Sequence, residues 1–247
     1  MQLLPALLAL VSPAAAAGQR TCAITDHGAS PSAHNNTRAI QSAIGACAGG
    51  GTVVVKGGHY KTGPLVVAGA KGLTIEVQQG SSLVAAFGPD DWPVTQDRPF
   101  AASLRDTPTP GPPPTPTTGH YQDFLVFDSC DHCGLTGEGM LFGKGGRPPT
   151  GFDWYYLFDQ GKLKHSRPMF LTVSASRNFT MKGITLLDAP EFNMALNGVT
   201  GAEISHVNIT STWYTDPKTG KLMEPHNTDG IVRTSPPAAP FSIVASC

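Results

Sequence analysis

Charged residues are scarce in this 247-residue sequence, and the scarcity excludes several classes of protein. Asp, Glu, Lys and Arg make up 14% of the chain, well below the usual quarter of a soluble domain, and the net charge is -1. Such a chain has no overall basic field for nucleic acid or for an anionic membrane surface. Neither is therefore expected as a partner.

Long apolar runs are missing from the chain after its first 17 residues. No run there approaches the ~18 residues that a membrane helix needs. The exception is the stretch 3–17, which ends in four alanines before Gly18. An apolar run followed by small residues is typical of a secretory signal peptide, although no Lys or Arg precedes this one. We expect residues 1–17 to be a signal peptide and residues 18–247 to be a secreted, soluble monomer; a disordered apolar tail is the alternative.

Glycine and proline are abundant instead, at 28 and 22 residues. Between them lie short runs rich in β-branched and aromatic residues, a pattern typical of many short strands joined by turns. The clearest strand signals are at 52–55, 65–67, 73–77, 82–85, 123–127 and 134–142. The sequence therefore predicts an all-β fold.

One segment, 36–47, has helical periodicity. It places Ile40, Ala43, Ile44 and Cys47 on one face and begins with an asparagine as a possible cap. We predict a short amphipathic helix that covers the first open end of the β-structure.

Two strand signals of the second half resemble each other. Phe179 and Ile204 are 25 positions apart, and so are Ile184 and Ile209. A period of this size indicates stacked repeats, in which each unit buries its apolar face against its neighbours. Because the strands are short, the turns tight and no helices intervene, we predict a parallel β-helix, a solenoid of stacked coils.

A Pro/Thr-rich stretch at 107–118 can form neither helix nor sheet. It is either a linker between domains or an extended loop. Strand signals of the same character occur on both sides, and the part before it has few large core side chains. We therefore predict a loop inserted into one domain.

Five cysteines suit an oxidising compartment. Cys22 and Cys47 flank the predicted helix and are candidates for one disulfide, Cys130 and Cys133 are candidates for a tight local bridge, and Cys247 is left over. A redox-active pair or half a zinc site is the alternative for Cys130 and Cys133, but no second pair or βαβ context accompanies them. We expect no metal and no cofactor.

Three Asn-x-Ser/Thr triplets begin at Asn35, Asn178 and Asn208. Such triplets are acceptors for N-glycosylation in secreted proteins, although they also occur by chance. The three asparagines are therefore candidate glycosylation sites.

The segment His226-Asn227-Thr228-Asp229-Gly230 places a carboxylate in a polar turn near the end of the chain. On a solenoid, loops on one side converge into a groove that suits a linear polymer. We predict Asp229 as a catalytic residue, with His226 and Asn227 in contact with substrate. The alternatives are an Asx-type turn in which Asn227 and Asp229 bond to the local backbone, and a solvated His226.

Several motifs, in this order, resemble the polygalacturonase family of pectin-degrading glycoside hydrolases. They are the segment from Cys22 through the predicted helix, 49–55, 62–65, Arg167-Pro168 and Asn227-Thr228-Asp229-Gly230. The resemblance implies a right-handed, pectin-lyase-like parallel β-helix. It also implies inverting hydrolysis of α-1,4 links between galacturonic acid units of pectin, with Asp229 helping to activate the attacking water.

Inverting hydrolysis requires a general acid and a general base roughly 6.5 to 9.5 Å apart. The family places further acidic residues in a Gly-Asp-Asp motif, followed by Gly-His-Gly and Arg-Ile-Lys, but none of these follows Gly230. The only Asp-Asp pair is Asp90-Asp91, far upstream. We therefore expect a β-helix domain truncated at its C-terminal end and inactive or nearly so. The alternative is a non-catalytic secreted protein that binds pectin or acts as a decoy.

Two further groups of side chains suit a pectic polymer. The aromatic segment 152–156 is expected in a loop, where its rings contact sugars or pack onto the surface. A basic cluster of Lys162, Lys164, His165 and Arg167 either meets galacturonate carboxylates or is solvated.

Overall fold

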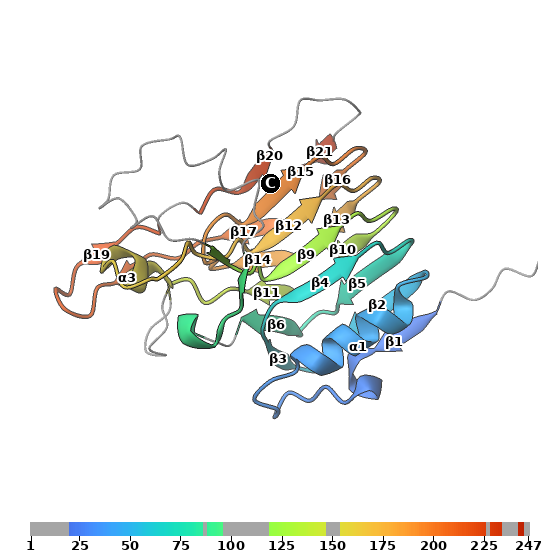
Figure 1. Cartoon of the computed structure of the whole chain (residues 1–247), viewed down its shortest axis with the longest axis horizontal. Coiled ribbons are helices and arrows are strands. Elements are labelled where there is room, and N and C mark those ends of the chain that lie inside the picture. Colours follow the sequence, from blue (N-terminus) through green and yellow to red (C-terminus); the bar gives the residue numbers. More distant parts are fainter. Residues whose placement is uncertain are drawn as a thin grey trace, which may run out of the picture.

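The computed structural model describes residues 20–85, 88–95, 119–146, 154–225, 228–233 and 242–244. Within these ranges the chain winds through three parallel sheets in turn, named here A, B and C, and each pass through the three sheets makes one coil. Figure 1 shows the coils stacked from β1 and β2, beside α1, to β20 and β21. The predicted parallel β-helix is confirmed.

Sheet A contains the most strands. It is made of β1 (Thr21–Ala23), β2 (Gly51–Val55), β5 (Leu73–Val77), β10 (Gly134–Thr136), β13 (Thr180–Lys182), β16 (Glu203–Ser205) and β21 (Ser242–Val244). Sheet B is made of β3 (His59–Thr62), β6 (Ser82–Ala85), β11 (Met140–Phe142), β14 (Thr185–Leu187) and β17 (Asn208–Thr210). Sheet C is made of β4 (Leu65–Ala68), β9 (Leu125–Asp128), β12 (Leu171–Ser174), β15 (Met194–Asn197) and β20 (Ile231–Arg233).

The core is built from the inward-facing side chains of the strands, and their alternation is clearest in β5. In β5, Leu73, Ile75 and Val77 are buried, whereas Thr74 and Glu76 are partly exposed. Parallel pairing repeats the inward position from coil to coil and so creates a column in sheet A, formed by Val53, Ile75, Leu135, Met181 and Ile204, each at most 1% exposed. Burial of each such side chain stabilises the fold by about 1.5–3 kcal/mol.

The predicted repeat period of 25 residues is wrong by two. Met181 lies opposite Ile204, 23 positions further on, and Leu186 lies opposite Ile209 at the same spacing. The comparison in the sequence chose Phe179 and Ile184, which are also buried but lie outside the strands. Because alternate residues of a strand share a face, an error of two leaves the inward face unchanged.

The helix α1 (Thr37–Cys47) covers the first coil, as predicted. Its buried residues are Ile40, Ala43, Ile44 and Cys47, and it contacts β1, β2 and β4. The predicted disulfide between Cys22 and Cys47 is present and ties the end of α1 to β1. The N-cap is Asn36, but its side chain makes no capping hydrogen bond and instead accepts one from the Ser30 N–H, at 2.8 Å.

The turns from sheet C to sheet A repeat one backbone conformation. Their first and fourth residues have a positive φ, whether these are glycines, as in the turns that contain 69 and 198, or other residues. The other residues are Ser129 (φ 53°), His132 (φ 55°), Ala175 (φ 46°) and Asn178 (φ 54°). The shape of this turn therefore follows from the stacking of the coils as much as from the local sequence.

The turns from sheet B to sheet C form the corner at which the coils differ most. Two of these turns are short, but three others are replaced by long segments, 86–124, 143–170 and 211–230, named here the first, second and third corner segments. The Pro/Thr-rich stretch 107–118 belongs to the first and lies outside the described residues. The strands on either side of it belong to the same three sheets.

The corner segments carry the remaining elements. They are η2 (Pro89–Asp91), β7 (Val94–Thr95) and β8 (His120–Tyr121) in the first, α3 (Trp154–Asp159) in the second, and β18 (Tyr214–Thr215) and β19 (Leu222–Met223) in the third; a short helix, η1 (Ile24–His27), precedes α1. Among the described residues, no helix is long and apolar enough to cross a membrane.

Candidate functional site

The three corner segments pack on one another through aromatic rings. The ring centroids of Trp92 and Trp154 are 5.6 Å apart, and those of Tyr121 and Trp154 are 5.2 Å apart. Tyr155 of the second segment lies 6.0 Å from Tyr214 of the third. The segments therefore form one layer beside the coils, and in Figure 1 α3 and β19 lie at its outer end.

The aromatic segment 152–156 was predicted to be a loop whose rings contact sugars or pack onto the surface. Where the structure describes it, the loop is wrong, and packing rather than sugar contact fits the two rings at 154 and 155. Residues 154–159 form α3, in which Trp154 and Tyr155 are 1% and 0% exposed. The Tyr155 hydroxyl donates a hydrogen bond to the carbonyl oxygen of Ala189, at 2.7 Å. These two rings face other corner segments, because their large apolar surfaces are needed to hold the layer together.

Asp229 lies at the end of the third corner segment, two residues before β20, and its side chain is exposed. Its backbone carbonyl accepts a hydrogen bond from the N–H of Asn193, at 2.9 Å. The Asn193 side-chain Nδ2 also donates to the carbonyl of Thr228, at 3.0 Å. Since Asn193 is 0% exposed, a buried amide fixes the backbone that presents the predicted catalytic carboxylate.

The predicted substrate contacts His226 and Asn227 lie outside the described residues. Asn193 was missed by sequence reasoning, because it lies 36 positions before Asp229 and only the stacking of coils brings the two together. An exposed carboxylate on a fixed turn can orient or deprotonate a water molecule. The role of Asp229 as a base therefore stays a prediction, and its exposed carboxylate is accessible to water.

The Asp90-Asp91 pair lies in η2 of the first corner segment. The Asp90 Oδ1 is 3.4 Å from Nζ of Lys164, with side chains 88% and 76% exposed. A solvent-exposed ion pair of this kind contributes little to stability.

Two buried carboxylates anchor the corner segments and were also missed. Asp123, 7% exposed, accepts hydrogen bonds from the Met169 N–H at 2.9 Å and from the Thr172 hydroxyl at 2.6 Å. Asp188, 0% exposed, accepts hydrogen bonds from both the N–H and the hydroxyl of Thr212, at 2.9 and 2.6 Å. Both carboxylates fix the backbone near the corner.

The basic cluster is divided between the interior and the surface. Arg167 is 1% exposed, its Nη1 donates to the carbonyl of Pro190 at 2.9 Å, and its guanidinium lies 4.3 Å from the centre of the Phe158 ring. Burial lowers the pKa of Arg167 from its usual range. For this arginine both alternatives, contact with galacturonate carboxylates and solvation, are wrong, because almost no surface of its side chain is exposed. The exposed Lys162 lies 5.8 Å above the ring of Tyr156.

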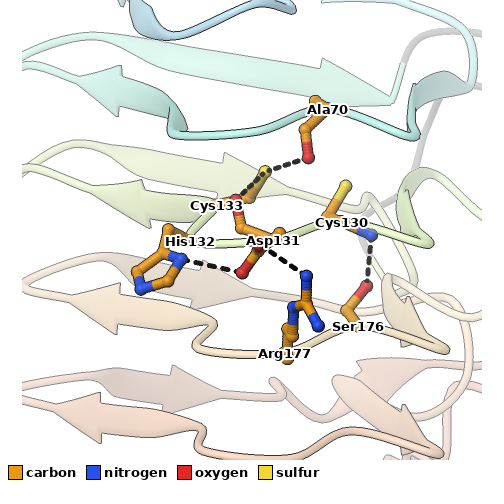
Figure 2. A network of polar contacts seen from close by, with 7 residues as sticks. All are labelled: Ala70, Cys130, Asp131, His132, Cys133, Ser176 and Arg177. Atoms are coloured by element: carbon orange, nitrogen blue, oxygen red, sulfur yellow. Dashed lines mark hydrogen bonds and ion pairs between the residues drawn. The ribbon is translucent and has the colours of Figure 1, made fainter.

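The predicted bridge between Cys130 and Cys133 is absent, and both residues are free, buried thiols. Each thiol bonds to the preceding coil: Cys130 Sγ to the carbonyl of Val67, and Cys133 Sγ to that of Ala70, both at 3.4 Å. Figure 2 shows the two sulfur atoms on one turn, with Cys133 directed toward Ala70. A hydrogen bond from Cys130 lowers the pKa of Cys133 to about 7 and raises that of Cys130.

A polar ladder runs along the same turns. Asp131 accepts a hydrogen bond from Nη2 of Arg177 at 2.9 Å and lies 2.7 Å from Nδ1 of His132 (Figure 2). The guanidinium, followed by the imidazole, holds the pKa of Asp131 below its usual value. A depression of about 290 Å³ lies beside the ladder, lined in part by Lys71 and Thr200. Among the described residues, no three His, Cys, Asp or Glu side chains are placed to hold a metal ion.

All three candidate glycosylation asparagines have exposed side chains. Asn35 accepts a hydrogen bond from the N–H of Thr37 at 2.9 Å, Asn178 lies in a turn from sheet C to sheet A, and Asn208 begins β17.

Comparison with known proteins shows that this chain is similar to polygalacturonases. The family "Glycosyl hydrolases family 28" matches residues 115–236. A probable polygalacturonase of Vitis vinifera is 26% identical over 165 residues, 64% of this chain and 30% of the relative. An endo-polygalacturonase of Pectobacterium carotovorum subsp. carotovorum is 25% identical over 203 residues, 79% of this chain and 44% of the relative.

Solved structures show the same fold. The family 28 exopolygalacturonase of Yersinia enterocolitica has a TM-score of 0.66 at 16% identity, covering 87% of this chain and 41% of that one. The polygalacturonase of Erwinia carotovora ssp. carotovora has a TM-score of 0.63 at 22% identity, covering 87% and 52%. The chain spans less than half the length of the Vitis vinifera and Pectobacterium carotovorum relatives. The motifs, the family match over residues 115–236 and the fold agree, and together they support a protein of the polygalacturonase family of glycoside hydrolases.

Proposed function

We propose that this chain binds pectic polysaccharide at the corner between sheets B and C and presents Asp229 there as the base that activates water for an inverting polygalacturonase reaction. One observation carries the proposal: the Thr228-Asp229-Gly230 turn projects an exposed carboxylate from a backbone fixed by the buried Asn193. The relatives named as polygalacturonases support the choice of substrate class.

In an inverting reaction the base and the acid lie on opposite faces of the sugar, separated by roughly 6.5 to 9.5 Å so that water fits between them. Asp229 takes the proton of the attacking water, while a second carboxylic acid protonates the departing oxygen. The family assigns that acid to a Gly-Asp-Asp motif, which does not follow Gly230 in this sequence. We therefore propose that the 247-residue chain binds pectic polymer and hydrolyses it slowly or not at all.

The test is to incubate the purified chain with polygalacturonic acid and to count reducing ends, with Asp229→Asn as the matched control. We expect binding by the chain and the same low release of reducing ends from both proteins. Rapid release that depends on Asp229 would overturn the proposed low turnover. Absence of binding would overturn the proposed pectic substrate itself. A non-catalytic pectin-binding protein would also bind without turnover. A chain extended by a C-terminal segment that carries the Gly-Asp-Asp motif separates this function from that of an incomplete enzyme, because only the incomplete enzyme should gain hydrolysis.

We further propose that residues 1–17 direct secretion and that Asn35, Asn178 and Asn208 carry N-linked glycans. The exposure of the three side chains supports this. Expression in a secreting eukaryotic cell, followed by N-terminal sequencing and glycosidase treatment, tests both. A mature protein that begins at Gly18 and loses mass on deglycosylation is expected, whereas retention in the cell with Met1 present would refute secretion.

A further inference from the structure

The two free cysteines occupy inward-facing positions of one turn. Cys130 and Cys133 lie between β9 and β10, and Asp131 of the same turn pairs with Lys71 in the coil before and with Arg177 in the coil after. This register aligns each cysteine with residues of the neighbouring coils that are at most 4% exposed. They are Ala70, Ser176 and Val199 for the first cysteine, and Leu73, Phe179 and Ala202 for the second. Both thiols therefore belong to the interior side of the turn.

The backbone of this turn brings the two positions close together. Asp131 pairs as an extended residue with both neighbouring coils, and His132 has a φ of 55°. An extended residue followed by one with a positive φ is the pattern of a type II turn, in which the Cα atoms of the flanking residues are less than ~7 Å apart. A disulfide requires about 4.4–6.8 Å between its Cα atoms. The aligned turns have the same positive φ at Gly72, Asn178 and Gly201, so the stacking of the coils maintains this geometry.

The two sulfur atoms are directed toward the same part of the preceding coil. The Cys130 thiol donates to the carbonyl of Val67, and the Cys133 thiol donates to the carbonyl of Ala70, which is the residue aligned with Cys130. The sulfur of Cys133 therefore leans across the turn (Figure 2). A hydrogen bond between the two thiols lowers the pKa of Cys133 to about 7, so the pair supplies a thiolate at neutral pH.

A small molecule can approach the pair from solvent. The depression of about 290 Å³ beside the polar ladder is lined by Cys130, together with Ser129 and Ser176. A water molecule occupies about 30 Å³ of liquid volume, so the depression admits molecules of a few heavy atoms. The two side chains themselves are each 2% exposed, which excludes large reagents.

We propose that Cys130 and Cys133 form a redox modification site, at which hydrogen peroxide converts the two thiols into a disulfide within the turn. One cysteine attacks a peroxide oxygen as its thiolate, the O–O bond breaks, and a sulfenic acid and hydroxide form. The thiol of the other cysteine then attacks this sulfur, so that an S–S bond forms, the S–O bond breaks and water leaves. The two thiols together lose two electrons and two protons, and the peroxide is reduced to two molecules of water. The inference does not rest on the proposed function.

The experiment uses the full chain with Cys247→Ser. Because Cys22 and Cys47 are joined, this leaves Cys130 and Cys133 as the free thiols. The folded protein is treated with hydrogen peroxide, quenched with catalase, denatured, alkylated and analysed by mass spectrometry. We expect loss of both alkylatable thiols, a mass lower by two hydrogen atoms, and a peptide in which the two cysteines are linked. Two thiols that remain alkylatable, or a sulfinic acid on either cysteine, would overturn the proposal.

The single variants Cys130→Ala and Cys133→Ala separate a cooperating pair from two independent thiols. Each variant lacks the cysteine that closes the bridge, so its remaining sulfenic acid should persist and be trapped by dimedone. The chain with both cysteines should give the disulfide and no trapped adduct. Equal trapping in the paired chain and in the variants would contradict the proposed closure. Circular dichroism checks that each variant is folded, and the result on the paired chain decides the proposal if a variant is not.

Discussion

Substitution of Gly137 by alanine tests how tightly the coils are stacked. Gly137 follows β10 with a φ of +109°, and a Cβ built on it would lie 2.1 Å from the carbonyl oxygen of Val77, in the coil before. A non-glycine residue at such a φ costs about 1–3 kcal/mol, and a forced shift in a packed region costs about 1–3 kcal/mol more. We therefore expect Gly137→Ala to lower the free energy of unfolding by about 2–6 kcal/mol.

The assay is thermal and urea unfolding followed by circular dichroism. For a chain of this size a loss of 1 kcal/mol lowers Tm by about 2–4 °C, so the expected decrease is several degrees at least. Gly45→Ala is the matched control, because Gly45 lies within α1 and its added Cβ would meet nothing within 4 Å. Alanine there should raise stability by about 0.5–1 kcal/mol. Equal Tm values for the two variants would refute the stacking geometry.

Three further changes have defined outcomes. Asn193→Ala removes the amide that holds the Asp229 turn, and should lower the free energy of unfolding by about 1–3 kcal/mol and accelerate hydrogen exchange in that turn. Cys47→Ser removes the disulfide at α1 and should cost about 2–4 kcal/mol, measured by urea unfolding. Arg177 lowers the pKa of Asp131, so this ion pair stabilises the fold above pH about 4, and its contribution is lost as the pH falls further. Arg177→Gln should therefore weaken the acid dependence of stability, measured as Tm against pH.

Each outcome has a matched comparison. Asn193→Leu keeps about the size of the side chain and loses the donor without adding a charge, so the turn should loosen as in Asn193→Ala; an unchanged turn in both would show that the amide does not fix Asp229. The Cys47→Ser variant should match the reduced unmodified chain, and a difference in stability under reducing conditions would refute the assignment to the disulfide. For the ion pair, an identical pH profile in Arg177→Gln would refute the contribution of Asp131.

The coil architecture could be predicted from the sequence because it depends on patterns within short segments. Strands of a few apolar residues alternate with glycine turns, and the helix 37–47 shows its apolar face at regular spacing. The register was misjudged by two residues, because Phe179 and Ile184 are as apolar as the strand residues beside them. Periodicity identifies the faces of strands, whereas hydrogen-bond pairing alone decides which residues lie opposite each other.

The sequence did not show which polar residues are buried at the corner between sheets B and C, for a different reason. In the sequence Arg167 stands among other basic residues, which is typical of an exposed segment, but its guanidinium is enclosed by Phe158 and the carbonyl of Pro190. Asn193 and Asp188 act on segments that lie tens of residues away and that the coils bring together. A buried polar residue of a solenoid cannot be recognised from periodicity in the sequence, because the group to which it bonds lies on a neighbouring coil.

The same stacking explains why one corner can carry both structure and function. Each coil contacts only its neighbours, so a segment inserted at one turn changes no pairing elsewhere in the sheets. Three long segments at one corner, with the short turn 188–193 between the second and the third, then contact one another, and the aromatic rings of Trp154 and Tyr155 join them into a layer. Buried carboxylates anchor that layer to the coils, and Asn193 holds the turn of Asp229. A support of this kind keeps an exposed side chain in one orientation, which is what a site built on loops requires.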